Sequence, residues 1–144
     1  MKQRIKKIIE EEKEKIKRTT DAKRKREKEL EELRNNAKDN LKTVLKKFTD
    51  SSLTLKLKNV TKKSNNLDEF EIEINGKNGI EIITAECSYQ IIKGHPVIKD
   101  NKGYSILTDS MGDCPDCTNI KEIETAIEEL IRIKSYLFID KEDL

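Results

Sequence analysis

Residues 70–75 are Phe-Glu-Ile-Glu-Ile-Asn, and this alternation of apolar and polar side chains decides the class of fold. Apolar residues at every second position are typical of a β-strand with one buried face and one solvated face. The same period of two appears in residues 53–58, Leu-Thr-Leu-Lys-Leu-Lys. Because antiparallel sheets commonly have one face on the core and the other in water, the two stretches predict an antiparallel sheet.

Further strands are expected after this pair, since short turn sequences separate several more apolar stretches. The predicted strands form a four- to five-stranded meander over residues 53–60, 69–75, 80–93, 96–99 and 103–108. In the third of them the apolar residues change phase between Ile82 and Ile83. A slip of one residue is typical of a β-bulge, so we expect a bulge or bend at this point.

Helical periodicity lies on both sides of the predicted strands. Apolar residues recur at helical spacing over 36–48, and a second stripe predicts a helix over 119–138. We expect both helices on one face of the sheet, which gives an α+β layer fold. Residues 1–35 are predicted to form an extended charged helical arm, and 36–144 the small α+β domain. The pair Asn35-Asn36 allows either a separate second helix or a bend in one long helix.

The predicted arm is rich in charge and poor in apolar side chains. Between Lys17 and Glu29 the only apolar residue is Ala22. On either side of this gap, apolar residues fit one a/d heptad register: Ile5, Ile9, Ile16, Leu30, Leu33, Ala37 and Val44. A sustained coiled coil needs three or four apolar heptads, and this seam is interrupted for about two. The arm therefore predicts either a dimer through its apolar ends or a solvated helix.

The charge of the chain is divided unequally between its two parts. The 144 residues carry a formal net charge of +2, but residues 1–50 hold 18 Lys and Arg against 11 Asp and Glu, and residues 51–144 hold 12 against 17. A basic arm on an acidic body favours a negatively charged partner or head-to-tail self-association. The candidate partner-binding or nucleic-acid-binding residues are Lys17, Arg18, Lys23, Arg24, Lys25, Arg26 and Lys28. Because the arm has no aromatic side chain for base stacking, binding of nucleic acid there would be limited to the phosphate backbone.

The most specific local motif is the C-x-x-C sequence formed by Cys114 and Cys117. With Cys87 and His95 it makes a Cys3His set of the kind that binds Zn²⁺ tetrahedrally, so zinc is the candidate cofactor. Two other interpretations remain open. Cys87 is in phase with the expected core face and fits a buried structural thiol, and a C-x-x-C close to the start of a helix can be redox active.

The sequence contains no recognisable catalytic set. His95 is the single histidine, and no G-x-S-x-G motif accompanies it. Phosphate-binding G-x-x-x-x-G-K-[ST], dinucleotide-binding G-x-G-x-x-G and zinc-binding H-E-x-x-H motifs do not occur. Carboxylate pairs such as Asp68-Glu69 are expected on solvated strand faces, where they are ordinary solubilising residues. The sequence therefore predicts a protein that is not an enzyme.

Two functions are compatible with these features. The first is a protein–protein interaction or adaptor protein, in which the basic helical arm serves association with a protein partner or a second copy and the acidic α+β domain recognises a partner. The alternative is an RNA- or ribosome-associated factor whose basic helix contacts the phosphate backbone, with a structural zinc site in its domain.

The sequence also indicates the cellular compartment. No apolar run approaches the ~18 residues that a membrane span requires, and the N-terminus lacks the apolar core of a signal peptide, so no membrane partner is expected. Three cysteines are an odd number, whereas a disulfide framework usually uses an even one. A reducing compartment is therefore expected, which means the cytoplasm, or the nucleus if the host is eukaryotic.

Overall fold

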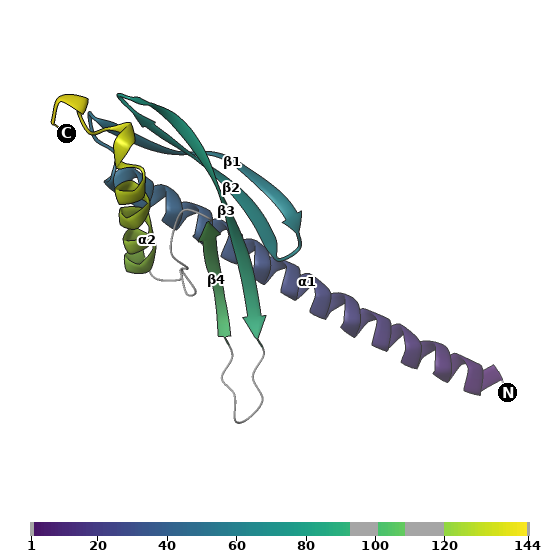
Figure 1. Cartoon of the computed structure of the whole chain (residues 1–144). Helices are drawn as coiled ribbons and strands as arrows, with labels where there is room; N and C mark the ends of the chain where they lie inside the picture. The colour runs from purple at the N-terminus through teal and green to yellow at the C-terminus, as the bar shows by residue number, and fades with distance from the viewer. Residues whose placement is uncertain (1, 93–100, 109–119, 144) are drawn as a thin grey trace.

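The described part of the chain forms a long N-terminal helix, an antiparallel sheet and a C-terminal helix (Figure 1). The computed structural model describes residues 2–92, 101–108 and 120–143. Its elements are α1 (Lys2–Lys47), β1 (Leu53–Ser64), β2 (Leu67–Gly76), β3 (Gly79–Ile92), β4 (Asn101–Thr108), α2 (Ile120–Ile133) and the 3-10 turns η1 (Ser135–Leu137) and η2 (Lys141–Asp143). The α+β class predicted from the sequence is confirmed.

The strands lie side by side in chain order, β1-β2-β3-β4, and each neighbouring pair is antiparallel. The described residues contain four strands of this meander. The remaining predicted strand, 96–99, lies outside the described residues. α1 packs on one face of the sheet and α2 packs against α1, and we call the opposite face of the sheet the outer face (Figure 1).

The β-bulge predicted at Ile82–Ile83 is wrong. The pairing of β2 with β3 continues without a shift, with Glu73 opposite Ile82 and Ile72 opposite Ile83. Ile83 is buried, whereas Ile80 and Ile82 are exposed. Successive side chains of a strand point to opposite faces, so the change of phase in the sequence reflects two isoleucines on the outer face of a regular strand.

The irregularities of the sheet lie instead in β1. Its register with β2 shifts between Leu57 and Asn59 and again between Lys62 and Ser64. The burial pattern follows the first shift, because Leu57 and the next partly buried residue, Val60, are three positions apart. A bulge bends its strand and increases the local twist, and here both shifts lie in the half of β1 that reaches the β1–β2 turn.

α1 is a single helix through Asn35 and Asn36, so the structure favours the one-helix interpretation of this pair. The chain leaves the helix through a polar turn. Thr49 Oγ1 accepts a hydrogen bond from the Leu55 amide at 3.0 Å, and Asp50 Oδ1 accepts one from the Ser52 amide at 2.7 Å. Hydrogen bonds from Ser52 lower the pKa of the Asp50 carboxyl. These contacts direct the chain from the helix into β1.

The core lies between the helices and the inner face of the sheet. The C-terminal part of α1 contacts β1, β3, β4 and α2. The largest fully buried side chains come from both helices and from the sheet: Leu41, Val44 and Leu45 of α1, Phe70, Ile72 and Ile74 of β2, Cys87 and Tyr89 of β3, and Ile123, Ile127 and Leu130 of α2. The part of α1 that precedes residue 29 contributes nothing to this core.

The segment after α2 docks on the β2–β3 turn. The helix predicted over 119–138 ends at Ile133 as an α-helix, and η1 follows. The Asn78 amide donates a hydrogen bond to the Leu137 carbonyl at 2.9 Å. A Cβ atom on Gly76 would lie 2.2 Å from that same carbonyl oxygen, so only glycine permits this close approach.

Candidate interaction surfaces

The N-terminal part of α1 projects beyond the domain as a free helix (Figure 1). Every residue from Lys2 to Lys28 is exposed, and the first buried one is Leu30. At a rise of 1.5 Å per residue the projecting part is about 40 Å long. We call residues 2–28 the arm, because the structure places the change from exposed to buried there.

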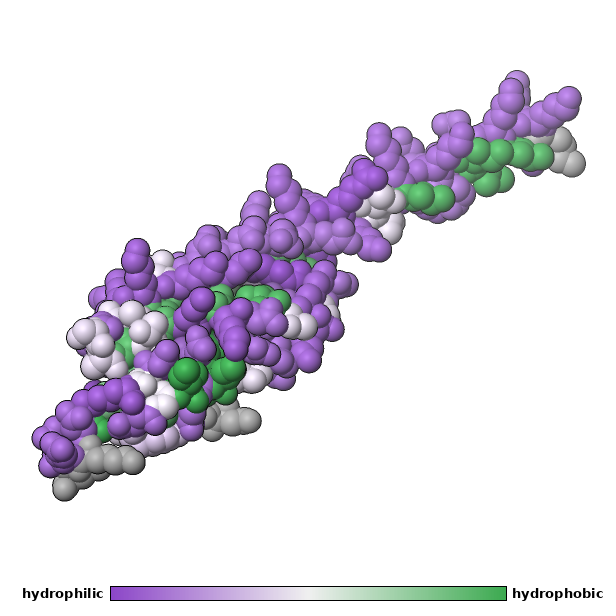
Figure 2. All heavy atoms as spheres, turned by 90° about the horizontal axis from the view of Figure 1, so that it is seen from above, coloured by the Kyte–Doolittle hydropathy of each residue, from purple (hydrophilic) through white to green (hydrophobic). Residues whose placement is uncertain are grey.

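Four exposed isoleucines lie along one side of the arm. Ile5, Ile8, Ile9 and Ile16 are between 46% and 66% exposed. We call them the isoleucine stripe, and Figure 2 shows apolar side chains along one side of the arm near its N-terminus, separated from the domain by a hydrophilic stretch. Exposed apolar side chains gathered in this way are typical of an interaction site.

In the structure, one group of residues from the predicted heptad seam is buried and the other is exposed. Leu30, Leu33, Ala37 and Val44, which continue the register of the isoleucine stripe, are buried in the core of their own domain. They are therefore occupied within the monomer. Only the first two heptads of the seam remain accessible to another molecule.

The cations predicted as binding residues lie on the exposed centre of the arm. All seven, from Lys17 to Lys28, are solvent-exposed. Arg18 lies 3.9 Å from Glu14, and within the part of the chain that the structure describes the other six make no ion pair. The centre of the arm is thus a basic surface without a counter-charge from the described part of the domain.

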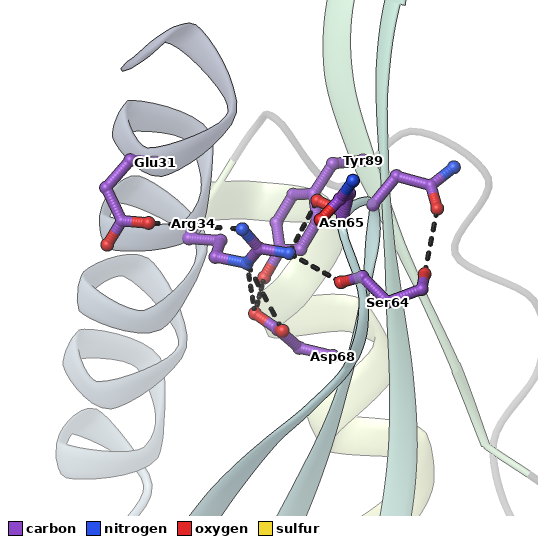
Figure 3. A network of polar contacts seen from close by, with 7 residues as sticks. Glu31, Arg34, Ser64, Asn65, Asp68 and Tyr89 are labelled. Atoms are coloured by element: carbon purple, nitrogen blue, oxygen red, sulfur yellow. Dashed lines mark hydrogen bonds and ion pairs between the residues drawn. The ribbon is translucent and has the colours of Figure 1, made fainter. Parts of the chain in front are cut away.

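A polar cluster that was not predicted from the sequence holds the arm at its base (Figure 3). Arg34 Nε donates to both carboxylate oxygens of Asp68, at 3.2 and 3.1 Å, and Tyr89 Oη donates to Asp68 Oδ2 at 2.8 Å. Arg34 Nη2 also donates to the carbonyl oxygens of Ser64 and Asn65. We call Arg34, Asp68 and Tyr89 the arm joint, because they connect α1 to the β1–β2 turn and to β3.

The arm joint is buried, and among the described residues no buried side-chain nitrogen or oxygen atom lacks a hydrogen-bond partner. The side chain of Asp68 is 4% exposed and that of Arg34 12%. The guanidinium also lies 5.4 Å from the centre of the Tyr89 ring, within the range of a cation–π contact. Burial raises the pKa of the Tyr89 hydroxyl, which therefore stays protonated as a donor. A buried cluster whose polar groups pair with one another fixes a geometry.

The position of Asp68 corrects the expectation that it lies on a solvated strand face. It is buried, on the same face of β2 as Phe70 and Ile72. The signal was present in the sequence, because Asp68 is in phase with those apolar residues. A carboxylate on a core face requires a cationic or hydrogen-bonding partner, but which residue supplies it could not be deduced from one sequence.

Of the proposed zinc ligands, only Cys87 lies in the part of the chain that the structure describes. Its side chain is fully buried on the core face of β3, and burial raises the pKa of the thiol to about 12. Zinc binds the thiolate form, so this environment favours the structural-thiol interpretation of Cys87. His95, Cys114 and Cys117 lie outside the described residues. Among those described, no group of three or more His, Cys, Asp or Glu side chains is placed to hold a metal ion.

Comparison with known proteins identifies no relative. No family model, no curated protein and no solved structure matches the chain. Among the helices of the described ranges, none combines the length and the apolar character that crossing a bilayer requires. The geometry of the arm, the arm joint and the outer face therefore carries the functional interpretation.

Proposed function

We propose that this chain is a non-enzymatic interaction protein that associates through its helical arm and recognises a partner with its acidic α+β domain. The observation that carries the proposal is the isoleucine stripe. Four branched aliphatic side chains stay about half exposed on the arm, in which every residue from Lys2 to Lys28 is exposed. Fully burying an exposed aliphatic side chain contributes about 1.5–3 kcal/mol, and roughly half of that remains for side chains that are about half exposed, which favours a binding role for the stripe.

The arm joint supports the same proposal. A helix that only solubilised the chain would need no defined direction, whereas here a buried arginine, an aspartate and a tyrosine hold the base of the arm against the sheet. Pre-organised binding elements lose less entropy when they bind. An arm whose base is fixed in direction is therefore suited to presenting its stripe to another protein.

A photo-crosslinking amino acid in place of Ile9 tests this function in the native host. We expect crosslinks to protein from position 9 and none from a matched probe at Glu14, which lies on the opposite side of the helix. Equal crosslinking from both positions, or from neither, would overturn the proposal.

The second candidate function is binding of RNA or the ribosome through the phosphate backbone. The observation that favours it is the exposed basic run between Lys17 and Lys28, largely without ion pairs among the described residues. Such binding weakens steeply with salt because each neutralised phosphate releases counterions. Anisotropy measurements with a labelled single-stranded RNA at rising salt test it, with Lys23→Gln/Arg24→Gln/Lys25→Gln/Arg26→Gln as the variant. This function predicts tight binding at low salt that the variant loses, and binding unchanged in the variant contradicts it.

A further inference from the structure

The residues that flank the isoleucine stripe define what it can bind. On the helix, Lys6 and Lys13 lie on one side of the stripe and Lys15 on the other, while Glu12 lies within it. Lys13 and Lys15 make ion pairs only with neighbouring glutamates of the same exposed helix, at 3.9 and 3.3 Å, among the residues that the structure describes. Such pairs contribute little, so both lysines remain available to an acidic partner.

Pairing of two arms along this stripe is therefore unfavourable. In a symmetric coiled coil the residues beside the seam of one helix face those of the other. Lysines would then meet lysines, and Glu12 would lie inside the seam of both helices. The complementary surface is instead apolar with glutamates around it.

The part of the outer face formed by β2 and β3 has this composition, with Lys56 of β1 beside it, opposite Glu73. Ile80 and Ile82 are 58% and 46% exposed on β3, and Glu73 on β2 lies directly opposite Ile82. Along the same face, Glu71 lies opposite Thr84, and Glu69 lies opposite Glu86. We call this set, Glu69, Glu71, Glu73, Ile80, Ile82 and Glu86, the acidic sheet patch.

The charges of the acidic sheet patch are largely unpaired. Lys63 contacts Glu69 at 3.2 Å, and in the described ranges Glu71, Glu73 and Glu86 make no ion pair. Two like charges directly opposite each other on neighbouring strands are destabilising, which is the situation of Glu69 and Glu86. A cation from a partner placed beside them would relieve this repulsion.

The dimensions of the two surfaces agree. The stripe from Ile5 to Ile16 extends about 16 Å along the helix. The face of β3 from Ile80 to Glu86 extends about 20 Å. The arm cannot reach the outer face of its own domain, because α1 packs on the inner face and projects away from the domain (Figure 1).

We propose that the isoleucine stripe of one chain docks on the acidic sheet patch of a second copy, with Lys6, Lys13 and Lys15 against its glutamates. This inference rests on the proposed function and names the partner as the chain itself. If each of two chains docks its stripe on the patch of the other, the contacts close a dimer. If each chain docks on the next one instead, the contacts extend into a longer assembly. Either arrangement buries two exposed apolar surfaces of the molecule against each other.

Sedimentation of the full chain and two variants tests the inference. The arm variant is Ile5→Ser/Ile9→Ser/Ile16→Ser and the patch variant Ile80→Lys/Ile82→Lys. The control is Ile133→Lys, since Ile133 on α2 is 46% exposed, like Ile82. We expect the parent and the control to self-associate, and each variant alone to weaken self-association at least tenfold. All substituted positions are exposed, and circular dichroism checks that the variants are folded.

Mixing the two variants distinguishes this contact from pairing of arms. The arm variant keeps an intact patch and the patch variant an intact arm, so an equimolar mixture should form a 1:1 complex that neither forms alone. A mixture that stays monomeric overturns the inference, as does a parent chain that is monomeric throughout the accessible concentrations.

The possible results distinguish a failure of this docking from a failure of the proposed function. Self-association that the arm variant abolishes and the patch variant leaves intact indicates pairing of arms, which overturns the docking and keeps the arm as the association element. Self-association that the arm variant leaves intact contradicts both. A monomeric parent whose position 9 crosslinks to another protein overturns only the identity of the partner.

Discussion

The two parts of α1 share one helix and one heptad register, yet one is buried and the other is exposed. Leu30 and Val44 pack in the core, whereas Ile9 and Ile16, in the same heptad register, face solvent. The difference lies in what stands opposite the helix, because the sheet covers only its C-terminal part (Figure 1). Apolar periodicity thus identifies the face of a helix that binds, and the rest of the fold determines whether the partner lies within the molecule.

The largest expected loss in the free energy of unfolding comes from a substitution at the boundary between the two parts of α1. Arg34→Ala leaves Asp68 buried without its cation, and breaking a buried pair in this way costs about 3–5 kcal/mol. Denaturant unfolding followed by circular dichroism measures the loss. Glu31→Ala is the control, since Glu31 is exposed and 3.9 Å from Arg34, and it should change the free energy of unfolding by less than about 0.5 kcal/mol. A small effect of Arg34→Ala would show that the arm joint does not hold the arm.

The second effect is the difference in the free energy of unfolding between a substitution in the buried part of α1 and one in its exposed part. Leu41 is 1% exposed and Ile9 46%. Leu41→Ala should lower the free energy of unfolding by about 2–5 kcal/mol through lost burial and a cavity, while Ile9→Ala should change it by less than about 0.5 kcal/mol under dilute conditions. Equal effects in the same unfolding experiment would mean that the arm folds against the domain.

The third effect is a pH dependence of the free energy of unfolding, which arises from Cys87. Burial raises its pKa in the folded chain from the ordinary value of 9.0 to about 12. The protonated thiol therefore contributes stability that is complete below pH 9 and is lost as the pH rises from 9 towards 12. The difference in unfolding free energy between the parent and Cys87→Ala should shrink by about 1.4 kcal/mol per pH unit in that range. A difference that is independent of pH would place the thiol in contact with solvent.

The smallest effect concerns the ion pairs of the arm. Glu12→Gln removes the contact with Lys15, at 3.3 Å, and should weaken the local helix by about 0.2–0.5 kcal/mol. Helicity measured by circular dichroism at low and high salt detects the change, which should be smaller at high salt because exposed charges are screened. A loss comparable to that of Arg34→Ala would indicate that the arm depends on a contact other than its own helix.

Much of the fold was predictable because it follows from side-chain periodicity. Alternation in residues 70–75 and helical spacing around Leu41 identified the sheet and the core face of the helix. The bulge was misplaced because the apolar residues of a strand change phase for either of two reasons. The strand has a bulge, or it is regular and carries exposed isoleucines such as Ile82, and one sequence does not distinguish the two. The arm joint was missed because Arg34 and Asp68 are 34 residues apart, and their contact depends on the path of the whole chain.

The same limit applies to the candidate sites. The basic residues of the arm, such as Lys25, were visible as composition, and their exposure follows from the absence of apolar neighbours. The acidic sheet patch was not visible, because Glu73 and Ile82 come together only through the register of β2 with β3. Cys87 was ambiguous between a zinc ligand and a core residue, and its burial on β3 favours the core residue.

Amide hydrogen exchange along α1, measured in dilute solution, tests the central claim that one helix contains a buried part and a free part. A helix segment without tertiary contacts is only marginally stable in water, and local protection follows local stability. We expect strong protection from residue 30 to residue 47 and protection close to that of an isolated helix from residue 2 to residue 28. Uniform strong protection along the whole of α1 in the monomer would contradict this claim.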